Sequence, residues 1–250
     1  MQPGDQGQLV GRWPEDLAAA SMALARRFSA HGTLWCWSPR WPQHAEHVAV
    51  EFVHPVIVGK RALPAVAVAD ADPVAALRAL TEAGDVVLVV ADSSTPGVDR
   101  VLRRAPAWGV ETIWIGSGPR PADSGADHLL WFDDAGDEAA FTGAFVLAYH
   151  VLWELTHVCF EHPGLLKPSA GTGDCADEHC ITCSDEGRLA EVVRPAGPGT
   201  VVVRTPEGLE DVDTTLVDPV GSGDLLLVHA GVALSRLDGD PVPATNGPRA

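Results

Sequence analysis

The stretch DVVLVVADSSTPGVDRVLRRAPAWGVETIWIG, residues 85–116, decides the fold of the first part of the chain. It sets an apolar run (85–91) before a polar turn, which is followed by a helical pattern (97–108) and a second apolar run (111–116). Continuous apolar strands that alternate with helices are typical of a parallel sheet covered by helices on both faces. We therefore expect a parallel α/β unit around this stretch.

The same alternation continues on both sides of the stretch. Helical patterns recur at residues 15–30, 43–54, 72–83 and about 138–161, and short apolar runs recur at residues 33–37, 65–69 and 128–132. Together these patterns predict a doubly wound, flavodoxin-like parallel sheet. We expect this α/β domain over residues 15–165, preceded by an N-terminal extension at residues 1–14.

The rest of the chain predicts a second domain that is small and all-β. Every Trp, Tyr and Phe lies at or before Phe160, so a later core would have to be built without aromatic side chains. Residues 166–178 are rich in Pro, Gly, Ser and Ala and are typical of a linker, and residues 241–250 resemble a disordered tail. Between them, residues 179–240 contain short β-rich runs separated by turns. This pattern predicts a five-stranded, OB-like barrel.

Composition excludes some classes of function. The formal net charge of −17 argues against nucleic-acid binding, which depends on a basic surface. No apolar run approaches the roughly 20 residues that span a bilayer, and the first residues lack the features of a secretory signal. We therefore expect a cytoplasmic protein that does not bind membranes. In that compartment the five cysteines are expected to be thiols or metal ligands rather than disulfides.

Three of those cysteines cluster around DEHCITCSDEG, residues 177–187. Cys180 and Cys183 form a CxxC pair, and Cys175 and His179 can complete a local zinc site with four ligands. A thioredoxin-type redox pair is a weaker interpretation, because that motif opens a helix whereas this one precedes a β-rich run. A third interpretation is that the cysteines are thiols that bind no metal and only pack or lie exposed. Spacing alone leaves these interpretations open.

Two of the helical patterns carry stripes of histidine and glutamate. His44, His47, Glu51 and His54 share one helix face, and a second stripe recurs at His150, Glu154, His157 and Glu161. On facing helices such side chains can bind a metal or act as an acid–base pair. They can equally be outward-facing surface, and the spacing does not decide between the two.

The second domain resembles a known family. HCITCSDEGRLAEVV (179–193) and EDVDTTLVDPVGSGDLLLVHAGVALSRLDGD (210–240) are similar to the small hydrogenase-maturation chaperones of the HypC/HupF type. The resemblance implies a β-barrel that, with the scaffold protein HypD, carries the Fe(CN)2CO unit to the large subunit of a [NiFe]-hydrogenase.

The family's iron-carrying cysteine and histidine fall on Cys180 and His229 of this chain. A thiolate and an imidazole are both good iron ligands, and two protein ligands leave coordination positions open for transfer. In the family the cysteine directly follows the initiator Met, whereas Cys180 is internal. Cys183 is an addition that can assist Cys180 or form a disulfide with it.

The first domain resembles a different family. PQHAEHVAVEFV (42–53), ALPAVAVA (62–69), the opening stretch (85–116) and FVLAYHVLWELTHV (145–158) are similar to sugar-isomerase (SIS) domains of the phosphoheptose isomerase type. The resemblance covers about residues 15–162 and implies assembly into a homo-oligomer.

The isomerase resemblance assigns two groups of site residues. The catalytic Glu and His of the family fall on Glu51 and His150, and His47 joins them in a zinc site found in some members. The family's phosphate loop falls on ADSSTPG (91–97), which includes the ligand-binding candidates Ser93, Ser94 and Thr95. In that loop Asp92 adds an anion and Pro96 lacks an N–H donor, so we expect sugar-phosphate isomerisation to be lost or severely weakened.

The leading interpretation is a non-catalytic maturation factor in which a dimerising or ligand-binding SIS-like domain is fused to an iron-carrying barrel. The alternative is a phosphosugar isomerase or sugar-phosphate-binding protein that is regulated by the barrel. A third interpretation is a structural zinc protein that uses the cysteine cluster.

Overall fold

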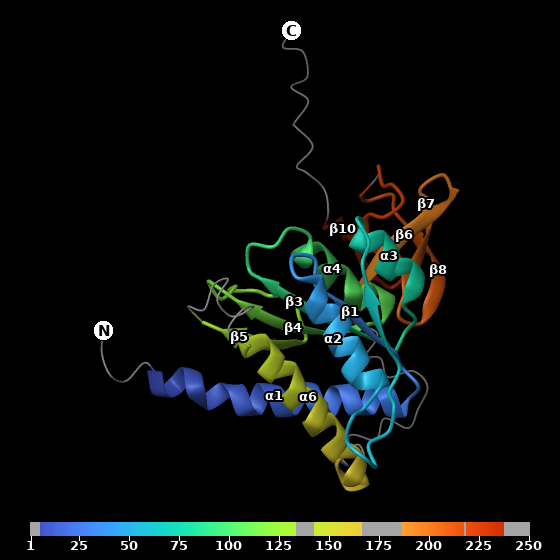
Figure 1. Cartoon of the computed structure of the whole chain (residues 1–250). Coiled ribbons are helices and arrows are strands. Elements are labelled where there is room, and N and C mark those ends of the chain that lie inside the picture. The colour runs from blue at the N-terminus through green and yellow to red at the C-terminus, as the bar shows by residue number, and fades with distance from the viewer. Residues whose placement is uncertain (1–5, 134–142, 167–186, 218, 238–250) are drawn as a thin grey trace. The chain divides into compact units, whose positions relative to one another are not determined.

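The computed structural model describes residues 6–133, 143–166, 187–217 and 219–237 (Figure 1). The chain divides into two compact units, Met1–Gly173 and Asp174–Ala250, and each unit has its own hydrophobic core. Most of the predicted linker and the whole of the predicted tail lie outside the described residues. Among the described helices, none combines the length and apolar character that a membrane span requires.

The first unit is built on a five-stranded sheet in the order β2-β1-β3-β4-β5. The strands are β1 (Leu34–Trp37), β2 (Ala65–Val68), β3 (Val86–Asp92), β4 (Glu111–Ser117) and β5 (His128–Phe132). Every neighbouring pair runs parallel. This confirms the predicted parallel sheet. Every residue of β3, the central strand, is buried, as expected for a sheet covered on both faces.

Helices pack on the two faces of this sheet. They are α1 (Gln6–Ser29), α2 (Pro42–Val53), α3 (Pro73–Leu80), α4 (Val98–Arg104) and α6 (Ala144–Glu161), with short 3-10 turns η1 (Ala105–Trp108) and η2 (Pro163–Leu166). Helices α1, α2 and α6 share one apolar core with alternate residues of the strands, such as Leu88 and Val90 of β3. Helices α3 and α4 contact each other on the opposite face (Figure 1).

Helix α1 begins earlier than the sequence predicts. It starts at Gln6 and runs through Pro14, so residues 6–14 continue the helix instead of forming an extension before it. Proline is usual in the first turn of a helix and costly in its interior. The neighbouring Trp13 attaches this part of the helix to β5: its indole N–H donates to the carbonyl of Trp131 at 2.9 Å, and its ring centroid lies 5.0 Å from that of Phe132.

The second unit is a closed five-stranded barrel in the order β10-β8-β7-β6-β9. Its strands are β6 (Arg188–Gly197), β7 (Thr200–Thr205), β8 (Gly208–Asp213), β9 (Leu225–His229) and β10 (Val232–Arg236). This confirms the predicted five-stranded barrel, whereas its OB-like character stays a prediction. The core is formed by small aliphatic side chains such as Val203, Leu226 and Val228.

A tight turn joins β9 to β10 and follows directly from the motif HAGV. His229 pairs with Val232, and the two residues between them, Ala230 and Gly231, have φ angles of 48° and 78°. Positive φ at both central residues is what a two-residue type I′ hairpin turn requires. The turn places His229 at the last position of β9, where its side chain is half-buried.

A partly buried ion pair network joins three elements of the first unit at Glu111. Arg27 at the end of α1 donates to the Glu111 carboxylate at 2.6 Å, and His128 at the start of β5 lies 3.0 Å from its other oxygen. The hydrogen bond from His128 and the Arg27 guanidinium outweigh the cost of burial, and together they lower the pKa of Glu111 from 4.5 to about 2.

The Glu111 network makes folding stability depend on pH. The pKa of Glu111 is lower in the folded protein than in the unfolded chain. Its contribution to stability is therefore complete above about pH 4.5 and is lost as the pH falls toward about 2. We expect Glu111→Gln to flatten the dependence of the unfolding free energy on pH in this window, measured by urea unfolding. Asp99→Asn, at an exposed ion pair with Arg103, is the control and should leave the slope unchanged. Equal slopes for Glu111→Gln and the wild type would contradict the assignment.

Candidate metal centre

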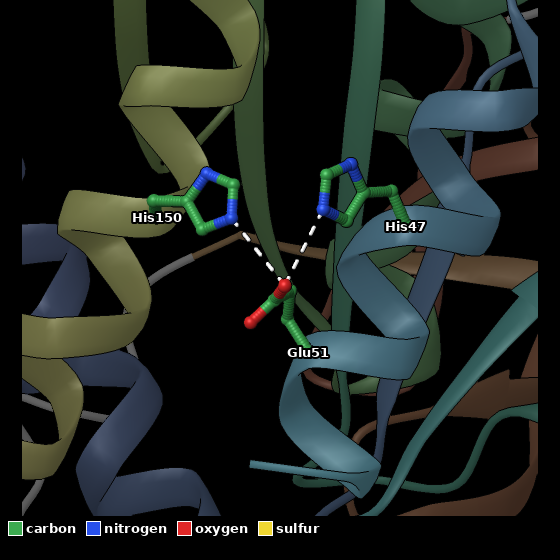
Figure 2. A group of neighbouring side chains, drawn as sticks. All are labelled: His47, Glu51 and His150. Carbon is green, nitrogen blue, oxygen red and sulfur yellow. Dashed lines mark ion pairs between the residues drawn. The ribbon is translucent and has the colours of Figure 1, made fainter. Parts of the chain in front are cut away.

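Helices α2 and α6 bring the predicted site residues of the first unit together. The buried face of α2 consists of His44, Ala45, Val48, Ala49 and Phe52. His47 and Glu51 are four residues apart and lie beside that face, so they project toward the neighbouring helix. On α6, His150 follows the fully buried Tyr149, and its side chain points toward α2 (Figure 2). Because α2 and α6 pack in one core, the side chains of His47, Glu51 and His150 come close together.

Figure 2 shows His47, Glu51 and His150 pointing toward one another across the two helices. The Nε2 atoms of His47 and His150 lie 3.3 and 3.4 Å from the same oxygen, Oε1 of Glu51. One ligand atom of each residue lies within 4.8 Å of the other two. Glu51 is the most enclosed of the three, with 18% of its side chain exposed against 40% and 38% for the histidines.

This geometry fits a zinc ion. Zinc binds imidazole nitrogen and carboxylate oxygen at about 2.0–2.2 Å, and the edges of such a tetrahedron measure about 3.3 Å. The two nitrogen–oxygen separations match that edge, and the third, between the histidine nitrogens, is within 4.8 Å. Three protein ligands with a fourth position left open are typical of catalytic rather than structural zinc sites. Without a metal, the same carboxylate and imidazoles can act as an acid–base group.

The backbone fixes the ring of His150 in the state that a metal ligand needs. Its Nδ1 lies 2.8 Å from the carbonyl oxygen of Val146 and donates to it. The neutral imidazole then keeps its lone pair on Nε2, the atom that faces Glu51. A backbone carbonyl is a usual outer partner for a histidine that binds metal.

Tyr149 is the outer hydrogen-bond partner of His47, as Val146 is of His150. Its hydroxyl lies 2.9 Å from Nδ1 of His47 and 3.4 Å from Nδ1 of the buried His44. Burial, with the charge of Glu51 as a smaller cause, raises the pKa of Tyr149 to about 12, so the hydroxyl keeps its proton. It can therefore donate to either histidine and accept from the other. When Tyr149 accepts from Nδ1 of His47, the Nε2 lone pair of His47 is directed to the metal position.

The remaining residues of the two stripes lie outside this cluster and have other surroundings. His157 is buried, and its two ring nitrogens contact the carbonyl oxygens of Trp153 and Arg61 at 2.9 and 3.1 Å. Lys60 forms ion pairs with Glu154 and Glu161 at 3.2 and 2.8 Å. His54 is exposed where α2 ends.

The loop after β3 holds the ligand-binding candidates Ser93, Ser94 and Thr95. The backbone N–H of Ser93 donates to the Ser117 carbonyl at 3.0 Å. The backbone N–H and hydroxyl of Ser94 both donate to the carboxylate of Asp92, at 2.8 and 2.5 Å. Arg40 also donates to that carboxylate, at 3.0 Å. Donors of this loop are thus taken up by a residue of the chain itself.

The structure locates only part of the predicted iron site. His229 is described, whereas Cys180 and Cys183 lie outside the described residues. The two cysteines of the first unit, Cys36 and Cys159, are buried free thiols, and burial raises the pKa of both. They are parts of the packed interior.

Two residues of these sites, Tyr149 and Arg40, were not predicted from the sequence. Tyr149 is the sole tyrosine of the chain and precedes a predicted site histidine, which is a usable signal. Arg40 reaches Asp92 from a loop 52 residues away in sequence, and nothing in the local pattern marks it.

We expect the first unit to bind one Zn²⁺ ion at His47, Glu51 and His150. Replacing any of the three by alanine should weaken binding more than about 100-fold, because outer partners alone contribute about 10- to 100-fold. The measurement is competition with a chromophoric chelator, in protein carrying Cys175→Ala, Cys180→Ala and Cys183→Ala so that these thiols do not compete. His54→Ala, at the exposed end of the same helix, should retain the wild-type affinity. Equal affinity in His150→Ala would contradict this site.

Tyr149→Phe tests the outer partner of the same site. The substitution keeps the ring packed between the helices and removes only the hydroxyl that contacts His47. We expect zinc affinity to fall about tenfold, with the unfolding midpoint little changed. An unaltered affinity would show that the hydroxyl has no influence on the ligand ring.

No protein-family model and no curated protein matches the chain. Solved structures are similar to it. A phosphoheptose isomerase from Francisella tularensis matches with a TM-score of 0.51 and 15% identity, over 61% of this chain and 91% of that one. Phosphoheptose isomerase GmhA from Neisseria gonorrhoeae matches at 0.48 and 17%, over 60% and 90% of the two chains. The sugar isomerase domain of the RpiR transcription factor from Sphaerobacter thermophilus matches at 0.46 and 14%, over 64% and 86%. The first structure shows that about three fifths of the chain has the SIS, phosphoheptose isomerase-like fold.

Proposed function

We propose that this protein is a cytoplasmic hydrogenase-maturation factor. Its barrel carries the Fe(CN)2CO unit, as cargo, to the large subunit of a [NiFe]-hydrogenase together with a HypD-type scaffold. Cys180 and His229 are the ligands, and Cys183 is an assisting thiol. The SIS-fold unit holds zinc or a small ligand and joins copies of the chain into a homo-oligomer. Exposed apolar side chains beside the candidate metal centre, Val50 on α2 and Leu147 on α6, are suited to that assembly.

The pairing of β6 with β9 carries this proposal. These strands run antiparallel with Arg188 opposite Val228, so the first residue of β6 lies at the end of β9 that carries His229. Cys183 and Cys180 precede Arg188 by five and eight residues in the sequence, and both lie outside the described residues. The barrel thus supports a thiolate and an imidazole acting on one cargo.

The chemistry of the two ligands suits a carrier. A closed site with four protein ligands retains its metal, whereas one thiolate and one imidazole leave positions for the diatomic ligands and for a partner's cysteine. His229 is half-buried at a strand end and is not sealed in the barrel core. A ligand at that position remains accessible to a partner that receives the iron.

The isomerase alternative rests on the cluster of His47, Glu51 and His150. In this alternative Glu51 would take a proton from a bound substrate, and His150, whose Nδ1 donates to the carbonyl of Val146, would exchange one with a substrate oxygen. A zinc ion bound there would polarise a carbonyl oxygen. The carboxylate of Asp92 in the loop after β3, onto which the family's phosphate loop falls, weighs against a phosphorylated substrate. For this reason we prefer the maturation role.

The test compares Cys180→Ala and His229→Ala with the wild type in a host that depends on this chain for hydrogenase maturation. We expect both variants to lose hydrogenase activity by about tenfold or more, because each removes a metal ligand. Co-purification with the HypD-type scaffold is measured in parallel. His54→Ala, at an exposed position in the other unit, is the control.

Unchanged hydrogenase activity in both ligand variants would overturn the proposal. Turnover of phosphosugars by the wild type, abolished in Glu51→Gln, would instead establish the isomerase alternative.

A further inference from the structure

The first unit contains a cavity between the segment that follows α2 and the last turn of α6. These two parts of the chain lie side by side (Figure 1). The cavity has a volume of about 170 Å³ and is lined by Gly59, Lys60, Arg61, His157, Phe160 and Glu161. A cavity of about 150 Å³ holds a molecule of the size of benzene. This cavity therefore has room for a small organic ligand.

The cavity is separate from the candidate metal centre. Helix α2 connects the carboxyl end of β1 to the amino end of β2, so the segment at residues 54–64 lies at the amino ends of these strands. On α6, His157 follows His150 by seven residues, which corresponds to about 10 Å along the helix axis. Ligands of open parallel sheets usually bind at the carboxyl ends of the strands. The cavity is thus a second place on this unit, with its own set of side chains.

Arg61 brings a guanidinium group to the cavity without an acidic partner. Its Cζ lies 4.7 Å from the centre of the Phe160 ring, and its side chain forms no hydrogen bond or ion pair among the described residues. Nε2 of the buried His157 lies 3.1 Å from the Arg61 carbonyl oxygen, so the backbone of Arg61 is held against α6. Stacking on an aromatic ring leaves the N–H donors of a guanidinium available at its edge. Arg61 is therefore positioned to bind an anion from outside the chain.

Lys60 is the second cation of the cavity. Only 10% of its side chain is exposed, and Nζ donates to Glu154 and Glu161 at 3.2 and 2.8 Å. The hydrogen bond to Glu161 is the main cause that raises the pKa of Lys60, against the cost of desolvation, so the ammonium group stays protonated. An ammonium group has three N–H donors. Two are used by the carboxylates, and the third has no partner among the described residues.

Glu161 limits the charge of the ligand that the cavity can take. Its carboxylate also lines the cavity, so it repels negative charge, and a ligand with one negative charge is favoured over one with two. A planar carboxylate matches the planar donor fork of Arg61. The Phe160 ring and the methylene stems of Lys60 and Arg61 offer apolar surface to the rest of the ligand.

We propose that this cavity binds a small organic monocarboxylate, about the size of benzoate, whose carboxylate group is held by Arg61 and Lys60. The proposal gives the small ligand of the SIS-fold unit a location and a chemical class, and it rests on that part of the proposed function. Arg61 and Glu161 are exposed, so the ligand can enter from solvent.

The test measures binding of 4-fluorobenzoate to the full-length chain by broadening of its ¹⁹F signal. We expect the wild type to broaden the signal and unlabelled benzoate to reverse the effect by competition. Arg61→Ala should weaken binding at least about tenfold, because it removes hydrogen bonds between charged groups. Arg61→Lys keeps the charge but removes the fork and the stacking, so it should also lose most of the affinity.

Two further variants provide the control and the opposite effect. Arg103→Ala makes the same change in net charge at an exposed ion pair on α4 and should leave the affinity unchanged. Glu161→Gln removes the like charge and one acceptor of Lys60, so it should bind the probe more tightly than the wild type. Unfolding midpoints of all variants show whether each of them folds.

A wild-type chain that does not bind the probe at millimolar concentration would overturn the proposal, and so would a folded Arg61→Ala chain with wild-type affinity. Inorganic phosphate that displaces the probe as well as benzoate does would also overturn it, because the site would then not select a carboxylate. A failure of the iron-carrier proposal would show in the Cys180 and His229 variants, which leave this cavity intact.

Discussion

The packing of α2 against α6 over one face of the sheet is the constraint on which the candidate metal centre depends. Phe52 of α2 and Phe145 and Leu152 of α6 are fully buried in the same core, which fixes how the two helices face each other. His47 and Glu51 come from one helix and His150 from the other, so no local segment could form the site alone. Tyr149 lies in this packed layer and connects the core directly to the ligand ring of His47.

Much of this architecture was predictable because its signals are local. The apolar run at residues 85–91 identified β3, which is buried on both faces, and the stripes on α2 and α6 identified His47, Glu51 and His150 as candidates. What the stripes could not show was which of their members face each other. His157 has the same spacing pattern as His150, yet it contacts backbone carbonyls in the interior. Both residues lie on one face of α6, so the two outcomes differ because of what each meets along the helix: Glu51 of α2 for His150 and the carbonyl of Arg61 for His157.

The loop after β3 shows a different limit of prediction. Its sequence already placed an acid at Asp92, but the effect of that acid depends on Arg40, which arrives from the end of β1 through strand pairing. Likewise, the position of His229 at the end of β9 that pairs with the start of β6 follows from how the barrel closes. In both cases a residue's role is decided by which strands are neighbours, and strand order is not encoded in any short segment.

The measurement that tests the central claim most directly is infrared spectroscopy of the protein purified anaerobically with a HypD-type scaffold. The account predicts bands in the CO and CN stretching regions for the wild type, and their loss in His229→Ala while the complex itself persists. A stable wild-type complex that shows no such bands, or bands that survive in both His229→Ala and Cys180→Ala, would contradict an iron carrier built on the barrel.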